Sequence, residues 1–364
     1  MKVITSPNTV LANCLQDTLD IVQPRIQINK PKEVVFSVGT QINGFPHIGT
    51  YLVQASAFVL AQKVQAKFGI PTRVVFGALD NAPYKVVETQ SGSYQIDWGH
   101  AEGHSGVMKL VTGSYIPYFE QLAQITGVPF EWSTYTAQQA SPEFRQVFID
   151  SLVHSDKIRW CVSPSNGILR MRIPCPQCHY AQKYADDTKL LGVSDGVAKF
   201  ACLCHEHGRY EVDIDVEGNG YIDLNTVYRN VIKEAIFAKQ SERLAVMVKG
   251  GDWLYSTQPV DWALAAMGFN SLQVPMRLFT PQILTGTGAK LSKSLIREGD
   301  TCMSEVPDWL LDMSKFRSMM SSNYANALVW LVEQFSADPR HFYRSYSYDE
   351  IVRLVNIFKE ECHE

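Results

Sequence analysis

Glu33-Val34-Val35-Phe36-Ser37-Val38 is a short and almost continuous apolar run, and it predicts a buried β-strand. Residues 39–49 follow as a turn-rich loop, after which residues 50–68 place apolar side chains at helical spacing. Gly69 favours a helix C-terminus, and residues 72–79 predict a second strand. This order of strand, helix and strand predicts a βαβ unit with parallel strands and a right-handed crossover.

The rest of the chain continues the α/β pattern, with an unusual stretch in its middle. Residues 170–215 are rich in cysteine and histidine, which indicates an inserted module bounded by Pro174 and Gly218. The other predicted elements are helices over residues 105–130 and 141–155, a strand over 244–248, a short helix over 259–268, a strand near 277–279 and helices from 306 onward. The sequence contains no internal repeat.

Composition limits the class of protein. The chain has 364 residues, of which 46% are hydrophobic, so it can bury a core and is long enough for two or three domains. A formal net charge of -4 argues against a protein that mainly coats nucleic acid. We find no N-terminal export signal and no apolar run that would span a bilayer, so we expect a cytoplasmic protein that does not interact with membranes.

The segment Pro46-His47-Ile48-Gly49-Thr50 lies where the first predicted strand gives way to a helix. Backbone N–H groups and the dipole at a helix N-terminus favour an anion such as a phosphate. His47 is a suitable hydrogen-bond donor, Gly49 lets the backbone approach a nucleotide, and Thr50 adds a hydroxyl. Taken alone, a histidine two residues before a glycine is more often an ordinary loop residue beside a helix start.

A second segment changes that balance. Lys290-Leu291-Ser292-Lys293-Ser294 follows Gly286 and Gly288, which predicts a mobile loop that carries two lysines. Such a loop can close over a triphosphate and follow the departing pyrophosphate, although a lone basic loop is usually just solvated. The two segments in this order, with the βαβ unit, favour an ATP site in which Ser292 and Ser294 also bind the nucleotide.

Two further positions fit such a site. Gly250 and Gly251 follow a predicted strand and leave room for adenine, and the carboxylate of Asp252 can bind ribose hydroxyls; a simple Gly-Gly-Asp turn is the alternative. Asp80 follows the strand at 72–79, at the carboxyl edge where parallel sheets bind ligands. We expect it to bind a substrate amino group, with a turn or cap as the alternative.

The cysteine-rich module predicts a zinc site. Four of the eight cysteines lie between positions 175 and 204, where metal binding is more plausible than oxidation without an export signal. The pairs Cys175/Cys178 and Cys204/His207 can each present two ligands from one turn to a tetrahedral zinc. Cys202 and His205 are alternative ligands for the second pair, and four reduced cysteines without a metal are the competing interpretation. A full set of protein ligands predicts a structural role.

The two phosphate segments resemble the HIGH and KMSKS signature motifs of class I aminoacyl-tRNA synthetases, and the arrangement is most similar to the class I lysyl-tRNA synthetase type. The resemblance covers roughly residues 33–330. It implies a Rossmann-like (HUP-type) parallel-sheet core, with His47, Thr50, Lys290 and Lys293 as catalytic residues. Two positions depart from it: Thr50 replaces the second histidine, and Gly250-Gly251-Asp252-Trp253 stands where lysyl enzymes have Gly-Lys-Asp-His.

The resemblance divides the chain and suggests an activity. The expected parts are a first half of the core (1–155), an inserted zinc module (156–218), a second half with the lysine loop (219–300) and a C-terminal helical tail (301–364). The expected reaction converts a lysine-like or other amino acid and ATP, with Mg²⁺, into an aminoacyl-adenylate.

The acceptor of the acyl group is left open by the sequence. Because no large helical anticodon domain follows the lysine loop, we expect a non-decoding acceptor such as a small amine or a carrier protein. The alternatives are a tRNA acceptor end, contacted through Arg170 and Arg172, and an inactive paralogue that binds and regulates.

Overall fold

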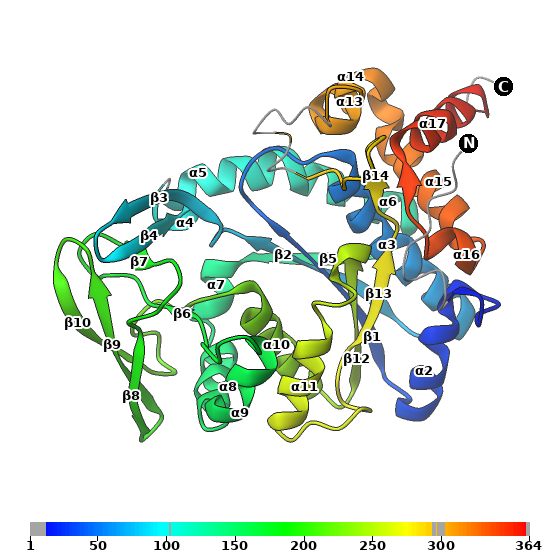
Figure 1. Cartoon of the computed structure of the whole chain (residues 1–364). Coiled ribbons are helices and arrows are strands. Elements are labelled where there is room, and N and C mark those ends of the chain that lie inside the picture. Colours follow the sequence, from blue (N-terminus) through cyan, green and yellow to red (C-terminus); the bar gives the residue numbers. More distant parts are fainter. Residues whose placement is uncertain (1–11, 102, 293–295, 297–302, 362–364) are drawn as a thin grey trace.

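The computed structural model describes residues 12–101, 103–292, 296 and 303–361. At its centre is a parallel sheet of five strands in the order β13-β12-β1-β2-β5 (Figure 1). These strands are β1 (Glu33–Gln41), β2 (Thr72–Leu79), β5 (Phe130–Thr134), β12 (Arg243–Gly250) and β13 (Met276–Thr280). The predicted α/β fold with a parallel central sheet is therefore confirmed.

The βαβ unit forms as its pattern predicts. Strand β1 is longer than its apolar run, and α3 (Ile48–Phe68) begins two residues before the predicted start. Gly69 ends this helix in a left-handed conformation with φ of 66°, and its N–H donates to the carbonyl oxygen of Gln65 at 2.9 Å. Strand β2 then lies beside β1 in parallel register, with Gly39 opposite Gly77.

One face of the sheet carries the larger apolar core. Alternate residues such as Val34, Phe36 and Val38 of β1 point to this face, where they pack against helices from both ends of the chain. Its helices are α3, α5 (Gly103–Leu110), the π-helical turn η2 (Val111–Tyr115), α6 (Ile116–Thr126), α13 (Asp308–Leu311), α14 (Met313–Met320), α15 (Tyr324–Ser336), α16 (Pro339–Phe342) and α17 (Tyr348–Glu361).

The opposite face is covered near its carboxyl end by a second group of helices. These are α7 (Tyr135–Ala140), α8 (Pro142–Leu152), α9 (Ser155–Val162), α10 (Thr226–Ala238) and α11 (Gln258–Ala266) (Figure 1). Asn225 caps α10, because its side-chain oxygen accepts from the N–H of Tyr228 at 2.8 Å. Alternation along the strands points Ser37, Gly39 and Gly77 toward this second face.

Small antiparallel sheets lie to one side of the core (Figure 1). They comprise β3 (Pro83–Thr89), β4 (Gly92–Asp97) and β7 (Ala181–Gln182); β8 (Lys189–Ser194), β9 (Val197–Cys204) and β10 (Gly208–Ile214); and β6 (Met171–Arg172) with β11 (Asp223–Leu224). The division of the chain at residues 155, 218 and 300 stays a prediction.

The remaining elements are short. They are η1 (Thr18–Ile21), α2 (Gln23–Asn29), α4 (Trp98–Ala101), η3 (Gly251–Trp253), η5 (Ser321–Asn323), and the parallel pair β14 (Ile283–Leu284) and β15 (Tyr346–Ser347). Among the residues described, no helix combines the length and the apolar character needed to cross a bilayer.

Candidate functional site

A cavity of about 570 Å³ opens at the carboxyl ends of β1, β2 and β12. This volume lies within the range of about 300–1,000 Å³ that is usual for small-molecule sites. In the sheet, β2 and β5 lie on one side of β1, and β12 and β13 lie on the other side. The cavity therefore lies at the point where the strand order reverses. Open parallel sheets bind ligands at such a switch point.

One wall of the cavity is the start of α3. His47 is the N-cap residue of this helix and is only 7% exposed, and His47, Gly49 and Thr50 all line the cavity. A methyl group on Gly49 would lie 3.0 Å from Cε1 and 3.1 Å from Nδ1 of His47, so the imidazole ring packs directly against the glycine backbone. The spacing of histidine and glycine thus has a steric reason in this structure.

A second wall combines the end of β12 with the lysine loop. Gly250, Asp252, Lys290 and Ser292 all line the cavity, whereas Gly251 does not. Lys290 Nζ lies 2.5 Å from Asp252 Oδ2, with both side chains partly exposed. Two predicted residues from distant segments therefore meet at one point.

The first part of the lysine loop is held in place by backbone contacts. The N–H of Thr285 donates to the carbonyl oxygen of Ala289 at 2.7 Å, and the N–H of Leu291 donates to Ile283 at 3.0 Å. Gly288 makes the tight turn possible, because its φ is 88°. Lys293 and Ser294, which the sequence also assigns to the site, lie outside the described residues.

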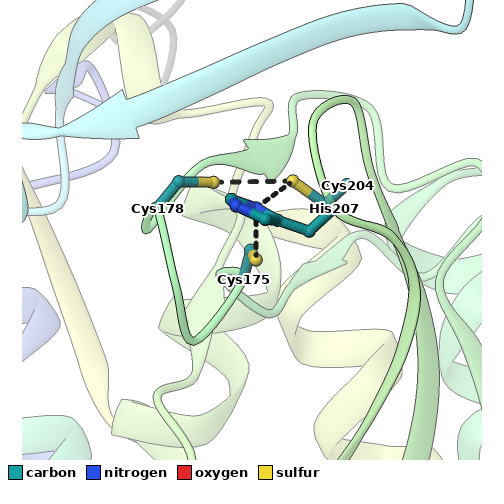
Figure 2. A group of neighbouring side chains, drawn as sticks. All are labelled: Cys175, Cys178, Cys204 and His207. Carbon is teal, nitrogen blue, oxygen red and sulfur yellow. Dashed lines mark hydrogen bonds between the residues drawn. The ribbon is translucent and has the colours of Figure 1, made fainter.

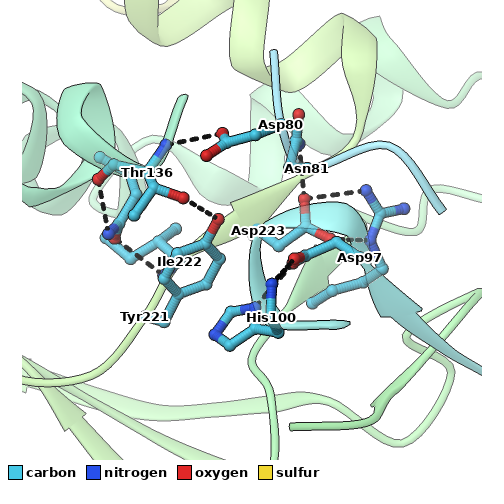
Figure 3. Close-up of polar contacts among 10 residues, drawn as sticks. Asp80, Asn81, Asp97, His100, Thr136, Tyr221, Ile222 and Asp223 are labelled. Atoms are coloured by element: carbon cyan, nitrogen blue, oxygen red, sulfur yellow. Dashed lines mark hydrogen bonds and ion pairs between the residues drawn. The ribbon is translucent and has the colours of Figure 1, made fainter. Parts of the chain in front are cut away.

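Asp80 lies in a different environment from the cavity (Figure 3). Its side chain is buried, is not part of the cavity lining, and accepts the N–H of Thr136 through Oδ1 at 2.9 Å. Burial raises the pKa of this carboxyl, although the bonds from Thr136 act the other way. The structure therefore does not bring Asp80 together with the other predicted site residues.

The third wall was missed by the sequence analysis, which assigned no helix to residues 226–238. Arg229, Asn230 and Lys233 of α10 line the cavity there, together with Gln138 of α7. Arg229 and Lys233 are four residues apart, so they share a face of α10. Burial, followed by the charges of Lys249 and Arg229, lowers the pKa of Lys233 to about 8. A basic i,i+4 pair within a largely apolar helix was the available signal.

A separate cluster, the Cys₃His cluster, contains the four predicted metal ligands Cys175, Cys178, Cys204 and His207 (Figure 2). Their ligand atoms all lie within 4.8 Å of one another. Cys178 Sγ and Cys204 Sγ are 3.5 Å apart, and His207 Nδ1 lies 3.5 Å from the Sγ atoms of both Cys175 and Cys204.

This geometry fits zinc. A tetrahedral ion with bonds of about 2.0–2.3 Å to nitrogen and sulfur holds its ligand atoms about 3.4–3.8 Å apart. The two alternative ligands lie elsewhere. Cys202 packs in the apolar core beside Phe200, and the ring of His205 packs against Tyr94 and Tyr180. A donor set of three cysteines and one histidine is typical of structural zinc.

Comparison with known proteins gives a weak structural similarity. No protein-family model matches the sequence, and no curated protein matches it either. Solved structures of related shape include a crystal structure described as a "putative arginyl t-RNA synthetase" from Campylobacter jejuni, with a TM-score of 0.41 and 8% identity over 95% of this chain and 72% of that chain. The similarity is to an aminoacyl-tRNA synthetase that is not of the lysyl type, and at this level it assigns neither a family nor an activity.

Proposed function

We propose that the protein uses ATP to activate the carboxylate of an amino acid as an aminoacyl-adenylate. The observation that carries this proposal is the convergence of three distant segments on one cavity at the switch point of the sheet. These segments are the start of α3, the Gly250–Asp252 corner and the loop at Lys290. Each of these segments has a sequence pattern that predicts nucleotide chemistry.

The proposed step is an in-line substitution at the α-phosphate. A carboxylate oxygen forms a bond to the α-phosphorus, the bond from phosphorus to the bridging oxygen breaks, and pyrophosphate leaves with that oxygen. His47 and the first N–H groups of α3 would stabilise charge on the α-phosphate, and Thr50 would donate one further hydrogen bond. Lys290, together with Lys293, would stabilise the departing pyrophosphate.

The ion pair between Lys290 and Asp252 suits a site that waits for its nucleotide. Both side chains are about 40% exposed, at 42% and 35%. Because exposed pairs of this kind contribute only about 0.2–1 kcal/mol, ATP can separate the two groups at small cost. Asp252 would then accept the ribose hydroxyls, while Lys290 turns to the phosphates, with Mg²⁺ entering as the metal complex of ATP.

The Cys₃His cluster takes no part in this step. Zinc held by Cys175, Cys178, Cys204 and His207 would stabilise the small sheet of β8, β9 and β10, because a structural zinc contributes directly to folding free energy. The four residues would fill all coordination positions. Their role is thus to hold the inserted segment beside the core.

For the second step, we propose transfer of the acyl group to a small amine or a carrier protein. The acceptor nucleophile would attack the carbonyl carbon, and AMP would leave. A tRNA acceptor end is the second candidate. Against it, Arg172 is occupied internally, since its Nε lies 2.6 Å from Oδ2 of buried Asp223.

The test of activation is exchange of labelled pyrophosphate into ATP, measured with each of the twenty amino acids. We expect exchange with a cognate amino acid only. Lys290→Ala should lower it about 10²–10³-fold, the usual loss for one transition-state contact. Lys315→Ala is the matched control, because Lys315 forms a similar pair with Asp308 at 2.6 Å, outside the cavity lining. Equal exchange by both variants would refute the role of Lys290.

The acceptor is tested separately. The enzyme, ATP, the cognate amino acid and total tRNA are incubated, and an acyl ester sensitive to mild base and to ribonuclease is sought. We expect little or none at physiological salt. Efficient ester formation would contradict the proposed acceptor and would indicate an aminoacyl-tRNA synthetase activity.

A further inference from the structure

We propose that the cavity selects an amino acid whose side chain ends in a carboxylate, as in aspartate or glutamate. This inference rests on the proposed function and names its substrate class. It comes from the wall of the cavity formed by α10 and α7, which no nucleotide motif explains.

Two donor groups converge on the floor of the cavity at this wall. A methyl group on Gly77 of β2 would lie 3.2 Å from Gln138 Nε2 and 3.7 Å from Lys233 Nζ. Gly39 lies opposite Gly77 on β1 and also lines the cavity. The absence of a side chain at Gly77 thus lets the Lys233 ammonium and the Gln138 amide lie directly on the sheet. The amide already donates to Ser133 Oγ at 3.1 Å, so the ammonium is the donor that remains for a ligand.

The neighbouring charges are balanced among themselves. Lys249 Nζ lies 3.1 Å from Oε1 of buried Glu234, and Arg277 pairs with the other oxygen of Glu234. Arg277 also reaches Asp261 at 2.6 Å. These two cations and two carboxylates on β12, β13, α10 and α11 therefore neutralise one another.

Lys233 and Arg229 take no part in these ion pairs. Within the residues that the structure describes, neither forms an ion pair with a carboxylate. Arg229 donates from Nη1 to Oδ1 of Asn81 at 3.0 Å. Asn81 in turn donates to Asp223 (Figure 3), and Asp223 is already paired with Arg172. Buried Arg229 and half-buried Lys233 thus face one cavity without an ion-pair partner in the described part of the chain, and a bound anion is the natural partner.

The ribose and adenine of ATP are poor occupants of this wall, because the corner proposed to hold them follows β12. Gly77 lies on β2, two strands from β12, which leads to Gly250 and Asp252. Neighbouring strands are about 4.8 Å apart, so the two positions are separated by about 10 Å across the sheet. An amino acid that reaches from the nucleotide to Lys233 would place its α-carboxylate at the α-phosphate and a second, side-chain carboxylate at Lys233. The positive charges of Lys233 and Arg229 would repel the ammonium of a lysine side chain.

The test is a comparison of matched amino acids in pyrophosphate exchange and in calorimetric binding. Aspartate and glutamate should support exchange at least about 100-fold better than asparagine, glutamine and lysine, because a neutral side chain leaves buried charges unpaired. A preference for a neutral or basic amino acid would overturn the inference while leaving activation intact. If no amino acid supports exchange, calorimetric binding of aspartate or glutamate decides: binding upholds the inference, and its absence refutes it.

A charge-reversal variant separates recognition from folding. Lys233→Glu should lose the preference for acidic amino acids and gain preference for lysine, a change that misfolding cannot produce. Lys239→Glu is the control, since Lys239 lies just past the same helix and pairs with Asp150 on the surface at 2.9 Å. If Lys233→Glu does not fold, Lys233→Met replaces it and should lose binding of aspartate and glutamate. Unchanged specificity in a folded Lys233 variant would contradict the inference.

Discussion

The Cys₃His cluster and the cavity are built on opposite principles. The cluster gathers its four potential ligands from one short segment, in a geometry compatible with a single zinc ion. The cavity gathers its groups from several segments along the chain, and two of its cations form no ion pair with a carboxylate among the residues that the structure describes. With zinc bound, the first arrangement would stabilise the fold. The second leaves charge available for a ligand, at a cost to stability.

The largest expected effect concerns the cluster. Cys175→Ser should remove most of the bound zinc and lower the free energy of unfolding by several kcal/mol, since zinc finger peptides bind the ion with about 10–16 kcal/mol. Metal analysis and denaturant unfolding measure both changes. Cys202→Ala is the control and should keep about one zinc per chain, because Cys202 packs in the core instead. Loss of zinc from the control would show that the ligand set is wrong.

The next effect, in the opposite direction, concerns Lys233. Its pKa is lowered from 10.5 to about 8, and one pKa unit corresponds to about 1.4 kcal/mol. At pH 7 the ammonium of Lys233 therefore destabilises the folded state, and Lys233→Met should raise the free energy of unfolding by up to about 3 kcal/mol. The gain should shrink as pH rises from 8 toward 10.5, because the lysine then loses its proton in the folded state first.

A control on the surface makes this result specific. Lys239→Met should change stability by less than about 0.5 kcal/mol, as is usual for exposed positions. If Lys233→Met is less stable than the parent at pH 7, Lys233 is a packing residue and the contrast between cluster and cavity fails.

The smallest effect is a pH dependence of binding. Below pH 8 the ammonium of Lys233 is protonated in the free protein, so the affinity for glutamate or aspartate should be constant. Above pH 8 it should fall by up to about tenfold per pH unit, because the anion binds the protonated form. The other charged groups facing Lys233 are Arg229, Glu234 and Lys249. Lys233→Arg should abolish this pH dependence of the affinity. If the affinity of the parent protein does not fall above pH 8, Lys233 is not the group that binds the carboxylate.

Sequence alone could predict the features that depend on neighbouring residues. The apolar run at 33–38 and the helical spacing up to Gly69 predict the βαβ unit, because burial and backbone geometry are local properties. The spacing of Cys175, Cys178, Cys204 and His207 predicts the cluster for the same reason, since each pair lies within one turn.

The wall of the cavity at α10 could not be predicted in this way. Whether Lys233 faces solvent or a cavity depends on packing against β2, which lies far away in the sequence. Asp80 illustrates the same limit from the other side. Its position after β2 predicts a ligand group, which stays a prediction, but the sequence does not show that Thr136 from another segment donates to its Oδ1. Motifs fix the chemistry of single segments, and the fold decides which segments meet.

The central claim is that this cavity transfers AMP to an amino acid carboxylate. The most direct test mixes the protein with MgATP, the twenty amino acids and hydroxylamine, which traps acyl-adenylates as hydroxamates, and then measures every product. The proposal predicts AMP, pyrophosphate and hydroxamate in equal amounts, with the aspartate or glutamate derivative predominating. Formation of ADP and phosphate, or no consumption of ATP with any amino acid, would contradict it.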